Sequence, residues 1–481
     1  MKSRTLASLA RWMATALVLF AAYAHAQPPV QIAGIWQGTL ELPTGARLRL
    51  VVNVREDAGA LTGTLNSVDQ GGRDLPIDSI QFENRRLLFT MNAISGRYEG
   101  ELAESGTEIV GTWSQGGGSL PLTLRRDSNV PVVARPQEPT RPLPYREEEV
   151  AYDSVPGVRL AATLTLPQGG GPFPAVVLIT GSGPQDRDES IAGHRPFYVL
   201  ADALTRRGIA VLRADDRGVG GSTGSVGGAT TSEDFATDAL AGVRFLAARA
   251  DIRNDAIGLV GHSEGGLVAP LAATRAVPEA RALKFLVLLA GPGVPLGDIL
   301  AAQQNLILGA QGAPAAMIEE NARVLERLIE ITIGEPDRDR AATAMRTVLT
   351  DSIATLPEGI RRAAGAQVEA QVQQMSSAWM QWMLAYDPLP ALRSLEIPVL
   401  ALFGERDLQV PPAQSKAPLE SALRAAGHPA SQVVELPGLN HLFQAAATGA
   451  PGEYATIEET MNATALELIG DWIVDRTAEQ P

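Results

Sequence analysis

The feature that most constrains this chain is a serine between an apolar run and a helical pattern of small residues. The run Ala256–Val260 leads without a gap into Gly261–Gly265, which reads Gly-His-Ser-Glu-Gly, and the helical pattern continues to Ala273. A strand, a G-x-S-x-G turn and a helix in this order expose the serine hydroxyl and leave the next backbone N–H free. Glycines suit such a turn because a Cβ would clash where the strand and the helix meet. Ser263 is therefore predicted to be a nucleophile.

The same pattern occurs a second time, in a different context. Gly220–Gly224 also reads G-x-S-x-G, and with 47 glycines in 481 residues a chance match is unsurprising. This copy lies in a Gly-rich loop well after the apolar run Ile209–Leu212, and no helical pattern begins before about Ser232. A nucleophile turn needs a strand and a helix on either side, so Ser222 is interpreted as a loop serine.

Size and charge limit the classes of protein that the chain could represent. Its 481 residues suggest two or three domains with a large core. The net charge of −14 argues against nucleic acid and anionic membranes as partners. The chain contains no cysteine, which excludes disulfides, a lipid-attachment cysteine and thiolate metal sites.

The N-terminal 26 residues have the pattern of a secretory signal peptide. Basic residues precede the apolar stretch Trp12–Phe20, and Ala24–Ala26 forms an A-x-A cleavage site. The alternative is an uncleaved anchor, but the apolar stretch is short for a membrane span. We therefore expect an exported bacterial protein, periplasmic or secreted, with no membrane span after cleavage of residues 1–26. The absence of disulfides is compatible with that location.

The mature chain is predicted to contain two domains joined by a linker. Residues 27–127 show short alternating strands such as Ala46–Val54, separated by turn signals, which indicates a small all-β barrel or sandwich. Trp36 and Trp113 lie in similar segments, and we expect them to be core residues on the opening and closing strands of one barrel. Residues 128–145 are rich in proline and cannot form a helix or a central strand.

From residue 146 to 481 the pattern changes to strands alternating with helices. Continuous apolar runs such as Ala175–Ile179 and Pro398–Phe403 are separated by amphipathic stretches such as Asp234–Arg249. This alternation predicts an α/β fold with a mostly parallel sheet covered by helices on both faces. Ligands bind such sheets at the carboxyl ends of the strands, so these ends are where we expect a site.

Two further residues are candidates for a catalytic triad with Ser263. Of the five histidines, His441 follows the last predicted strand, whereas His262, next to the serine on a sharp turn, should point away from it. The acid is expected in the loop after the preceding strand, where Asp407 is favoured and Glu405 is the alternative. Nucleophilic serine catalysis needs this base and this acid, and the chain order Ser, Asp, His is one of three known orders.

Taken together, these motifs resemble the α/β-hydrolase superfamily from about residue 146 to 475. The resemblance rests on Gly-His-Ser-Glu-Gly-Gly at the turn, Gly-Glu-Arg-Asp at Gly404–Asp407, Asn-His-Leu-Phe at Asn440–Phe443, and the stretch Arg213–Ser222. The subgroup that it resembles is that of exported bacterial serine esterases with a β-rich N-terminal domain. The resemblance implies Ser263 as nucleophile, Asp407 as acid and His441 as base. It also implies an oxyanion hole formed by the backbone N–H groups of Ser182 and Glu264.

The long interval between Ser263 and Asp407 departs from the simplest members of this superfamily. Residues 296–385 carry helical periodicity over Ala315–Ile329, Arg338–Leu349 and Ile360–Met383. We interpret this segment as a helical cap over the site, which would limit substrate size and exclude water. Met375, Trp379 and Met383 are candidate lining residues of an acyl pocket, with packing between cap and core as the alternative role.

The function that the sequence favours is hydrolysis of a small or medium carboxylic ester through a covalent acyl-enzyme, the EC 3.1.1 type. A peptidase or acyl-aminopeptidase of the same fold, a thioesterase, and a non-catalytic binding protein on a hydrolase scaffold remain alternatives. No cofactor fingerprint or metal-ligand spacing is present, so neither is implied. The expected partner is a small-molecule ester, and the β domain is expected to have a structural role or to form a homodimer.

Overall fold

The computed structural model describes residues 32–41, 47–57, 59–68, 72–115, 118–126, 133–225, 227–275, 277–354, 358–365 and 367–478. The chain divides into two compact units whose main boundary lies between Val130 and Pro131. The signal peptide expected at residues 1–26 lies outside the described residues and stays a prediction. Each unit is described by itself below.

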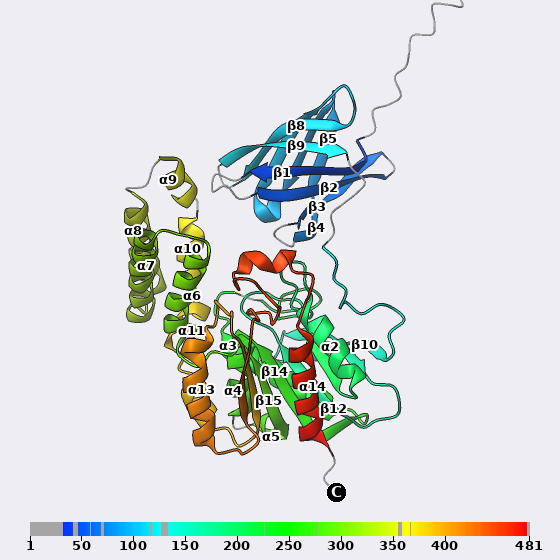
Figure 1. Cartoon of the computed structure of the whole chain (residues 1–481), viewed down its shortest axis with the longest axis vertical. Helices are drawn as coiled ribbons and strands as arrows, with labels where there is room; N and C mark the ends of the chain where they lie inside the picture. Colours follow the sequence, from blue (N-terminus) through cyan, green and yellow to red (C-terminus); the bar gives the residue numbers. More distant parts are fainter. Residues whose placement is uncertain are drawn as a thin grey trace, which may run out of the picture. The chain divides into compact units, whose positions relative to one another are not determined.

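The first unit is an antiparallel β-sheet of nine strands (Figure 1). The strands occur in the sheet in the order β4-β3-β2-β1-β9-β8-β7-β6-β5. The two ends of the sheet come together, because only Ile77 and Asp78 separate the edge strands β4 and β5. The Ile77 N–H donates to the Gly63 carbonyl of β3 at 3.0 Å, and the Asp78 N–H donates to the Thr90 carbonyl of β6 at 2.9 Å. This curvature buries one face of the sheet, as the barrel prediction requires. The strands are β1 Gly34–Glu41, β2 Arg47–Asp57, β3 Ala60–Ser67, β4 Gly72–Pro76, β5 Ser79–Glu83, β6 Arg86–Met91, β7 Gly96–Leu102, β8 Glu108–Gln115 and β9 Gly118–Arg126.

The two tryptophans of this unit are core residues, as predicted. Trp36 is fully buried and its indole N–H donates to the Ile32 carbonyl at 2.9 Å, while Trp113 is 5 % exposed. Their expected positions on the opening and closing strands need a correction. Trp113 lies on β8, whereas the strand that pairs with β1 is β9. The similar Gly-x-Trp segments place both rings in the core but do not mark neighbouring strands.

The described part of the proline-rich segment, residues 133–145, contains neither helix nor strand. It is nevertheless fixed to the second unit by side-chain hydrogen bonds. The Arg135 guanidinium donates to the Ala455 carbonyl at 2.9 Å, and the Gln137 side chain bonds both to the Met461 carbonyl and to the Thr460 N–H. Proline removes backbone donors, so side chains make the contacts that hold this segment in place.

The second unit is built on an eight-stranded sheet of order β10-β11-β13-β12-β14-β15-β16-β17. The pairs β10–β11 and β11–β13 are antiparallel, and from β13 to β17 every pair is parallel. The carboxyl ends of β14, β16 and β17 therefore meet at one edge of the sheet. The strands are β10 Arg146–Asp153, β11 Arg159–Leu166, β12 Phe173–Ile179, β13 Ala210–Ala214, β14 Ile252–His262, β15 Leu283–Leu289, β16 Val399–Gly404 and β17 Gln432–Leu436.

Alternation along the buried strands divides the core into two layers. Val177, Leu212 and Leu259 face one layer, which also holds apolar residues of α3, α4 and α13. Their neighbours in sequence face the opposite layer, under α2 and α14. Because both faces of these strands are buried, successive residues are all apolar, and their sequences show no alternation of polar with apolar residues. The helices are α2 Pro196–Arg206, α3 Ser232–Ala247, α4 Glu264–Ala273, α5 Pro278–Ala282, α12 Leu389–Arg393, α13 Pro412–Ala426 and α14 Ala463–Thr477.

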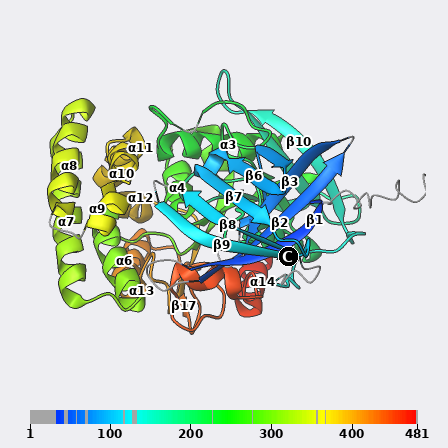
Figure 2. The same cartoon turned by 90° about the horizontal axis from the view of Figure 1, so that it is seen from above.

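Among the described residues, six helices lie within residues 296–385, the segment predicted to be a cap. They are α6 Leu296–Ala310, α7 Ala315–Gly334, α8 Arg338–Ile353, α9 Glu358–Gly365, α10 Val368–Met375 and α11 Ala378–Ala385. The helices α7 and α8 lie side by side in both views (Figures 1 and 2). The cap has a small hydrophobic core of its own, which includes Leu328, Met345 and Val372.

The turn between β14 and α4 has the backbone geometry that the sequence predicted. Ser263 has φ 53° and ψ −115°, a backbone conformation that residues other than glycine seldom adopt. The missing side chains of Gly261 and Gly265 make this geometry compatible with close packing. A Cβ at Gly261 would lie 2.0 Å from the Gly265 carbonyl oxygen, and one at Gly265 would lie 2.2 Å from the Ile179 carbonyl oxygen.

We predict that Gly265→Ala destabilises the second unit by at least about 1–3 kcal/mol, because the added methyl group meets rigid backbone of β12. Urea unfolding followed by circular dichroism measures this loss. Gly309→Ala is the matched control: this helical glycine has open space around it, so the same change should stabilise by up to about 1 kcal/mol. Equal effects of the two substitutions would contradict the packing argument.

Candidate active site

The loops after β16 and β17 bring His441 and Asp407 together. The His441 Nδ1 lies 2.8 Å from the Asp407 Oδ2, and both side chains are buried. The other Asp407 oxygen accepts the backbone N–H groups of Gln409 and Val410, at 2.8 and 2.9 Å. An acid held by two N–H groups stays oriented, so it can fix the tautomer of the imidazole.

Glu405, the alternative acid, has a different role in the loop. Its side chain is exposed, and Oε2 accepts the Gly438 N–H at 2.7 Å. It therefore ties together the loops after β16 and β17. Gly404 allows these loops to approach, because a Cβ there would lie 2.4 Å from the Leu439 carbonyl oxygen.

Ser263 and His441 line one cavity of about 270 Å³, here called the nucleophile cavity. Ser263 is fixed by its backbone, whose N–H donates to the Leu289 carbonyl at 2.8 Å. Among the described residues, no hydrogen bond joins its hydroxyl to the imidazole. Such catalytic contacts are often long without substrate and shorten in the complex. The three residues predicted as a triad thus meet at one edge of the sheet.

Two backbone N–H groups on opposite sides of Ser263 form the candidate oxyanion hole. Glu264 is the first residue of α4, and Ser182 lies in the loop after β12; both line the nucleophile cavity. Within the part of the chain that the structure describes, neither N–H donates to a protein acceptor. Free donors beside a nucleophile can stabilise a developing oxyanion, and the N-terminal end of α4 adds a favourable dipole.

Three carboxyl groups, those of the buried Glu189 and Glu264 and the partly buried Asp216, hold the loop that carries Ser182. Glu189 accepts the Gly181 N–H at 2.6 Å, and Asp216 accepts the Gln185 N–H at 3.0 Å. The Ser182 hydroxyl interacts with the Glu264 carboxyl. These contacts replace the rigidity that a strand would provide, because they fix the loop at successive residues.

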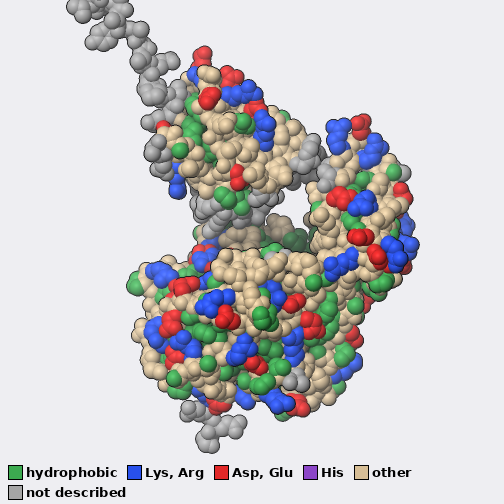
Figure 3. Space-filling model, turned by 180° about the vertical axis from the view of Figure 1, so that it is seen from behind, with side chains coloured by type: hydrophobic (Ala, Val, Ile, Leu, Met, Phe, Trp, Pro, Cys, Tyr) green, Lys and Arg blue, Asp and Glu red, His purple; other side chains and the backbone are tan. Residues whose placement is uncertain are grey.

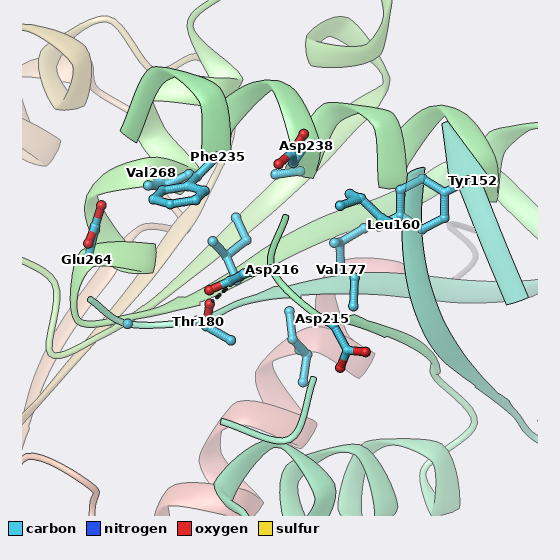
Figure 4. Close-up of a pocket in the computed structure, with 15 residues that line it drawn as sticks. Tyr152, Leu160, Val177, Thr180, Asp215, Asp216, Phe235, Asp238, Glu264 and Val268 are labelled. Atoms are coloured by element: carbon cyan, nitrogen blue, oxygen red, sulfur yellow. Dashed lines mark hydrogen bonds between the residues drawn. The ribbon is translucent and has the colours of Figure 1, made fainter. Parts of the chain in front are cut away.

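Thr180 and Asp216 line a small cavity of about 50 Å³, and the Thr180 hydroxyl donates to Asp216 at 3.0 Å (Figure 4). The pKa of Asp216 is raised to about 7, chiefly by burial and also by the charges of Glu264 and Glu189, although the hydrogen bonds from Gln185 and Thr180 oppose the shift. Burial also raises the pKa of Glu264. Protons on these acids reduce the repulsion between closely spaced carboxyl groups.

His262, which was expected to point away from Ser263, forms a buried pair with Glu189. Its Nδ1 lies 2.8 Å from the Glu189 carboxylate, and its Nε2 lies 3.0 Å from the His441 carbonyl oxygen. Burial opposes the charge of His262, but the charge of Glu189 and the hydrogen bonds to both partners raise its pKa. His262 thereby positions the backbone of the candidate base. Sequence reasoning missed Glu189, which lies in a loop without a motif.

The cap residues chosen from sequence have two different environments. Trp379 and Met383 line the nucleophile cavity, together with Leu296, Ile299 and Leu300 of α6. Met375 does not: it is 5 % exposed and packs in the hydrophobic core of the cap. Its assignment to the pocket was wrong, because it lies on α10 and faces α7 and α8 instead of the site.

Ser222, in the second G-x-S-x-G match, is a structural loop residue. Its hydroxyl donates to the Asp215 carbonyl at 2.8 Å and accepts the Ala161 N–H at 2.9 Å. This hydroxyl has no role at the nucleophile cavity, and its interpretation as a loop serine is confirmed. The match is explained by the tight turns of the loop, where Gly220 and Gly224 have positive φ.

Figure 3 shows acidic and basic side chains interspersed on the visible face of the second unit. The described residues contain no group of three or more His, Cys, Asp or Glu residues able to hold a metal ion. Within the same residues, no helix is both long and apolar enough to cross a membrane.

Comparison with known proteins finds one matching family model and several esterases that are similar to this chain. Residues 156–313 match the family model of X-Pro dipeptidyl-peptidase (S15 family). Over 304 residues the chain is 27 % identical to esterase EstD of Thermotoga maritima, a match that covers 63 % of this chain and 61 % of EstD. This chain thus matches less than two thirds of the length of EstD.

Two solved structures are also similar. The esterase Pf2001 of Pyrococcus furiosus has a TM-score of 0.41 at 15 % identity, covering 69 % of this chain and 91 % of its own. Est1E of Butyrivibrio proteoclasticus, solved with ferulic acid, has a TM-score of 0.40 at 19 % identity, covering 69 % and 100 %.

The strand order, the turn at Ser263 and the placement of Asp407 and His441 after the last two strands define the α/β-hydrolase fold. The resemblance to this superfamily is confirmed, and so is the fold class with its preceding all-β unit.

We predict that the stability of the second unit falls between about pH 4 and pH 7 through Asp216. Its pKa is raised to about 7 in the folded state, so the folded protein binds the proton more tightly than the unfolded chain, and rising pH removes this stabilisation. Asp216→Asn should match the wild type near pH 4. At pH 8 it should be more stable by up to about 4 kcal/mol, measured by thermal unfolding across pH.

The neighbouring residue provides a control of opposite sign. Burial acts to raise the pKa of Asp215, but the hydrogen bonds from Arg187 and Gly221 outweigh it and the pKa is lowered. Asp215 therefore stabilises the folded state above its unfolded pKa and loses this effect as the pH falls. Asp215→Asn should destabilise the protein at pH 8. If Asp216→Asn is no more stable than the wild type at pH 8, the pKa of Asp216 is not raised. A gain in stability from both substitutions would instead point to a general effect of removing negative charge.

Proposed function

We propose that this protein is a serine carboxylesterase. The observation that carries the proposal is the convergence of Ser263, the His441–Asp407 pair and two backbone donors on one cavity. The relatives named above that are called esterases support the same class of reaction. Because EstD is matched over only part of its length, activity and substrate are inferred here from the site.

The site can perform the reaction in two balanced steps. In the first, the Ser263 oxygen attacks the ester carbonyl while its proton passes to the His441 Nε2, and the N–H groups of Ser182 and Glu264 stabilise the oxyanion. The C–O bond to the alcohol then breaks, and the alcohol leaves with the proton from His441. In the second step, water gives a proton to His441 and attacks the acyl-enzyme; the C–O bond to Ser263 then breaks, the proton passes from His441 to the serine oxygen, and the acid is released.

Peptide hydrolysis is the second candidate, because the matched family model describes an X-Pro dipeptidyl-peptidase. An enzyme that removes dipeptides would need an acceptor for the free amino terminus of its substrate. The carboxylates lining the nucleophile cavity are Glu189 and Glu264. Both are engaged by neighbours, and the remaining oxygen of each is buried. This arrangement favours ester hydrolysis over the removal of dipeptides.

Ser263→Ala should abolish both labelling by a fluorophosphonate probe and release of p-nitrophenol from p-nitrophenyl acetate, since the acyl-enzyme can no longer form. Ser222→Ala is the matched control and should retain labelling, because Ser222 is a structural loop residue. Labelling that persists in Ser263→Ala would place the nucleophile elsewhere. Faster turnover of an X-Pro p-nitroanilide than of any p-nitrophenyl ester would favour the peptidase.

The identity of the acid gives a separate prediction. Asp407→Asn should lower kcat on p-nitrophenyl acetate by about 10⁴-fold, because an amide no longer fixes the required tautomer of His441. Glu405→Gln should leave kcat nearly unchanged, since an amide oxygen can still accept the Gly438 N–H. Steady-state kinetics on the two variants distinguish the residues, and the reverse pattern would assign the acid to Glu405.

A further inference from the structure

A second cavity adjoins the nucleophile cavity and is used by nothing described so far. Its volume is about 350 Å³, within the usual range for small-molecule sites. We call it the side cavity, and its lining residues are Ser182, Gly183, Pro184, Gly227, Gly228, Thr230, Phe235, Gln374, Ser377 and Trp379. It lies between the loop that carries Ser182, the segment before α3, and the cap helices α10 and α11.

The two cavities share three lining residues, Ser182, Gln374 and Trp379. Trp379 is fixed in this boundary, because its indole N–H donates to the Glu264 Oε1 at 2.8 Å. The same carboxyl oxygen accepts the Ser232 hydroxyl at 2.6 Å. Glu264, the residue next to the nucleophile, is thus bonded to the cap helix α11 through Trp379. This bond holds the indole at the boundary of the two cavities.

The chemistry of the site indicates which part of an ester would enter the side cavity. The leaving alcohol must receive its proton from His441, which lines the nucleophile cavity and is not part of the side cavity. The alcohol therefore lies on the His441 side. The carbonyl oxygen lies against the N–H of Ser182, at the boundary. The acyl group, on the other side of the carbonyl carbon, then extends past Ser182.

The composition of the side cavity limits the acyl group that it can accept. Phe235, Pro184 and Trp379 provide apolar surface, and none of the described lining residues is Asp, Glu, Lys or Arg. Burying a charged acyl group there would leave it without a partner, at a high energetic cost. An apolar chain or ring would instead gain from burial.

We propose that the side cavity is the acyl subsite, which accepts an uncharged acyl group of medium length or an aromatic acyl group, with Trp379 as its wall and Glu264 as the residue that positions this wall. The proposal rests on the proposed esterase function. It differs from the acyl pocket expected from sequence, because Met383 lines the nucleophile cavity and not the side cavity.

The test fills the side cavity and measures selectivity on p-nitrophenyl acetate, octanoate and benzoate. Thr230 lines the side cavity and not the nucleophile cavity. Thr230→Trp should therefore reduce the kcat/KM ratio of octanoate to acetate, and that of benzoate to acetate, by about tenfold or more. Thr343→Trp introduces the same side chain on the exposed face of α8, away from both cavities, and should leave both ratios unchanged.

A second series separates the acyl group from the alcohol. With ethyl acetate and 2-naphthyl acetate, Thr230→Trp should not change the ratio of kcat/KM values, since the alcohol lies on the His441 side. If Thr230→Trp does not fold, Phe235→Leu tests the same proposal in the opposite direction, because it widens the cavity and should raise the octanoate to acetate ratio.

The outcomes separate this proposal from the proposed function. Unchanged acyl ratios in a folded variant, or a fall in the alcohol ratio instead, would overturn the acyl subsite while Ser263-dependent ester turnover remained. If the wild type showed no Ser263-dependent turnover of any ester, both the acyl subsite and the proposed esterase function would be overturned. Trp379→Phe removes the indole N–H and should change the acyl ratios. Glu264→Gln keeps an oxygen that can accept this N–H and should retain them. This pair of results would support the positioning role of the indole hydrogen bond.

Discussion

The strained turn at Ser263 is the constraint on which the rest of the site depends. A backbone with φ 53° and ψ −115° is unfavourable for serine, so the surrounding packing has to hold it. That packing is possible only because β12, β14 and α4 approach closely at Gly261 and Gly265. This turn places the first N–H of α4 and the serine hydroxyl at the carboxyl edge of the sheet. A change in this turn would displace the nucleophile and one oxyanion donor together.

The loop that provides the second donor is stabilised differently, by buried carboxyl groups. Glu189, Asp216 and Glu264 come from separate parts of the chain and contact successive residues of the loop from Thr180 to Gln185. Burying three acids near one another is costly unless protons and hydrogen bonds compensate. A raised pKa for Asp216 and Glu264 and the pairing of Glu189 with His262 supply this compensation. The site thereby gains a rigid loop without regular secondary structure.

The cap shows where prediction from sequence succeeds and where it does not. Helical periodicity located the helices between β15 and β16, because an amphipathic pattern follows from local geometry. It could not decide which side of each helix faces the site. Met375 and Met383 have similar side chains, yet one packs among α7 and α8 and the other lines the cavity. The difference comes from the break between α10 and α11, which the continuous pattern over Ile360–Met383 concealed.

The sequence by itself determined the fold class of the second unit and the three residues of the candidate triad. Apolar runs, glycine spacing and polar residues after strands are local patterns whose physical causes are short-range. Tertiary structure alone decided the pairing of Glu189 with His262, the contact between Glu264 and Trp379, and the neighbour of β1 in the first unit. These contacts join residues separated by tens of positions or more. They depend on how elements pack in space, and no local pattern in the chain encodes that.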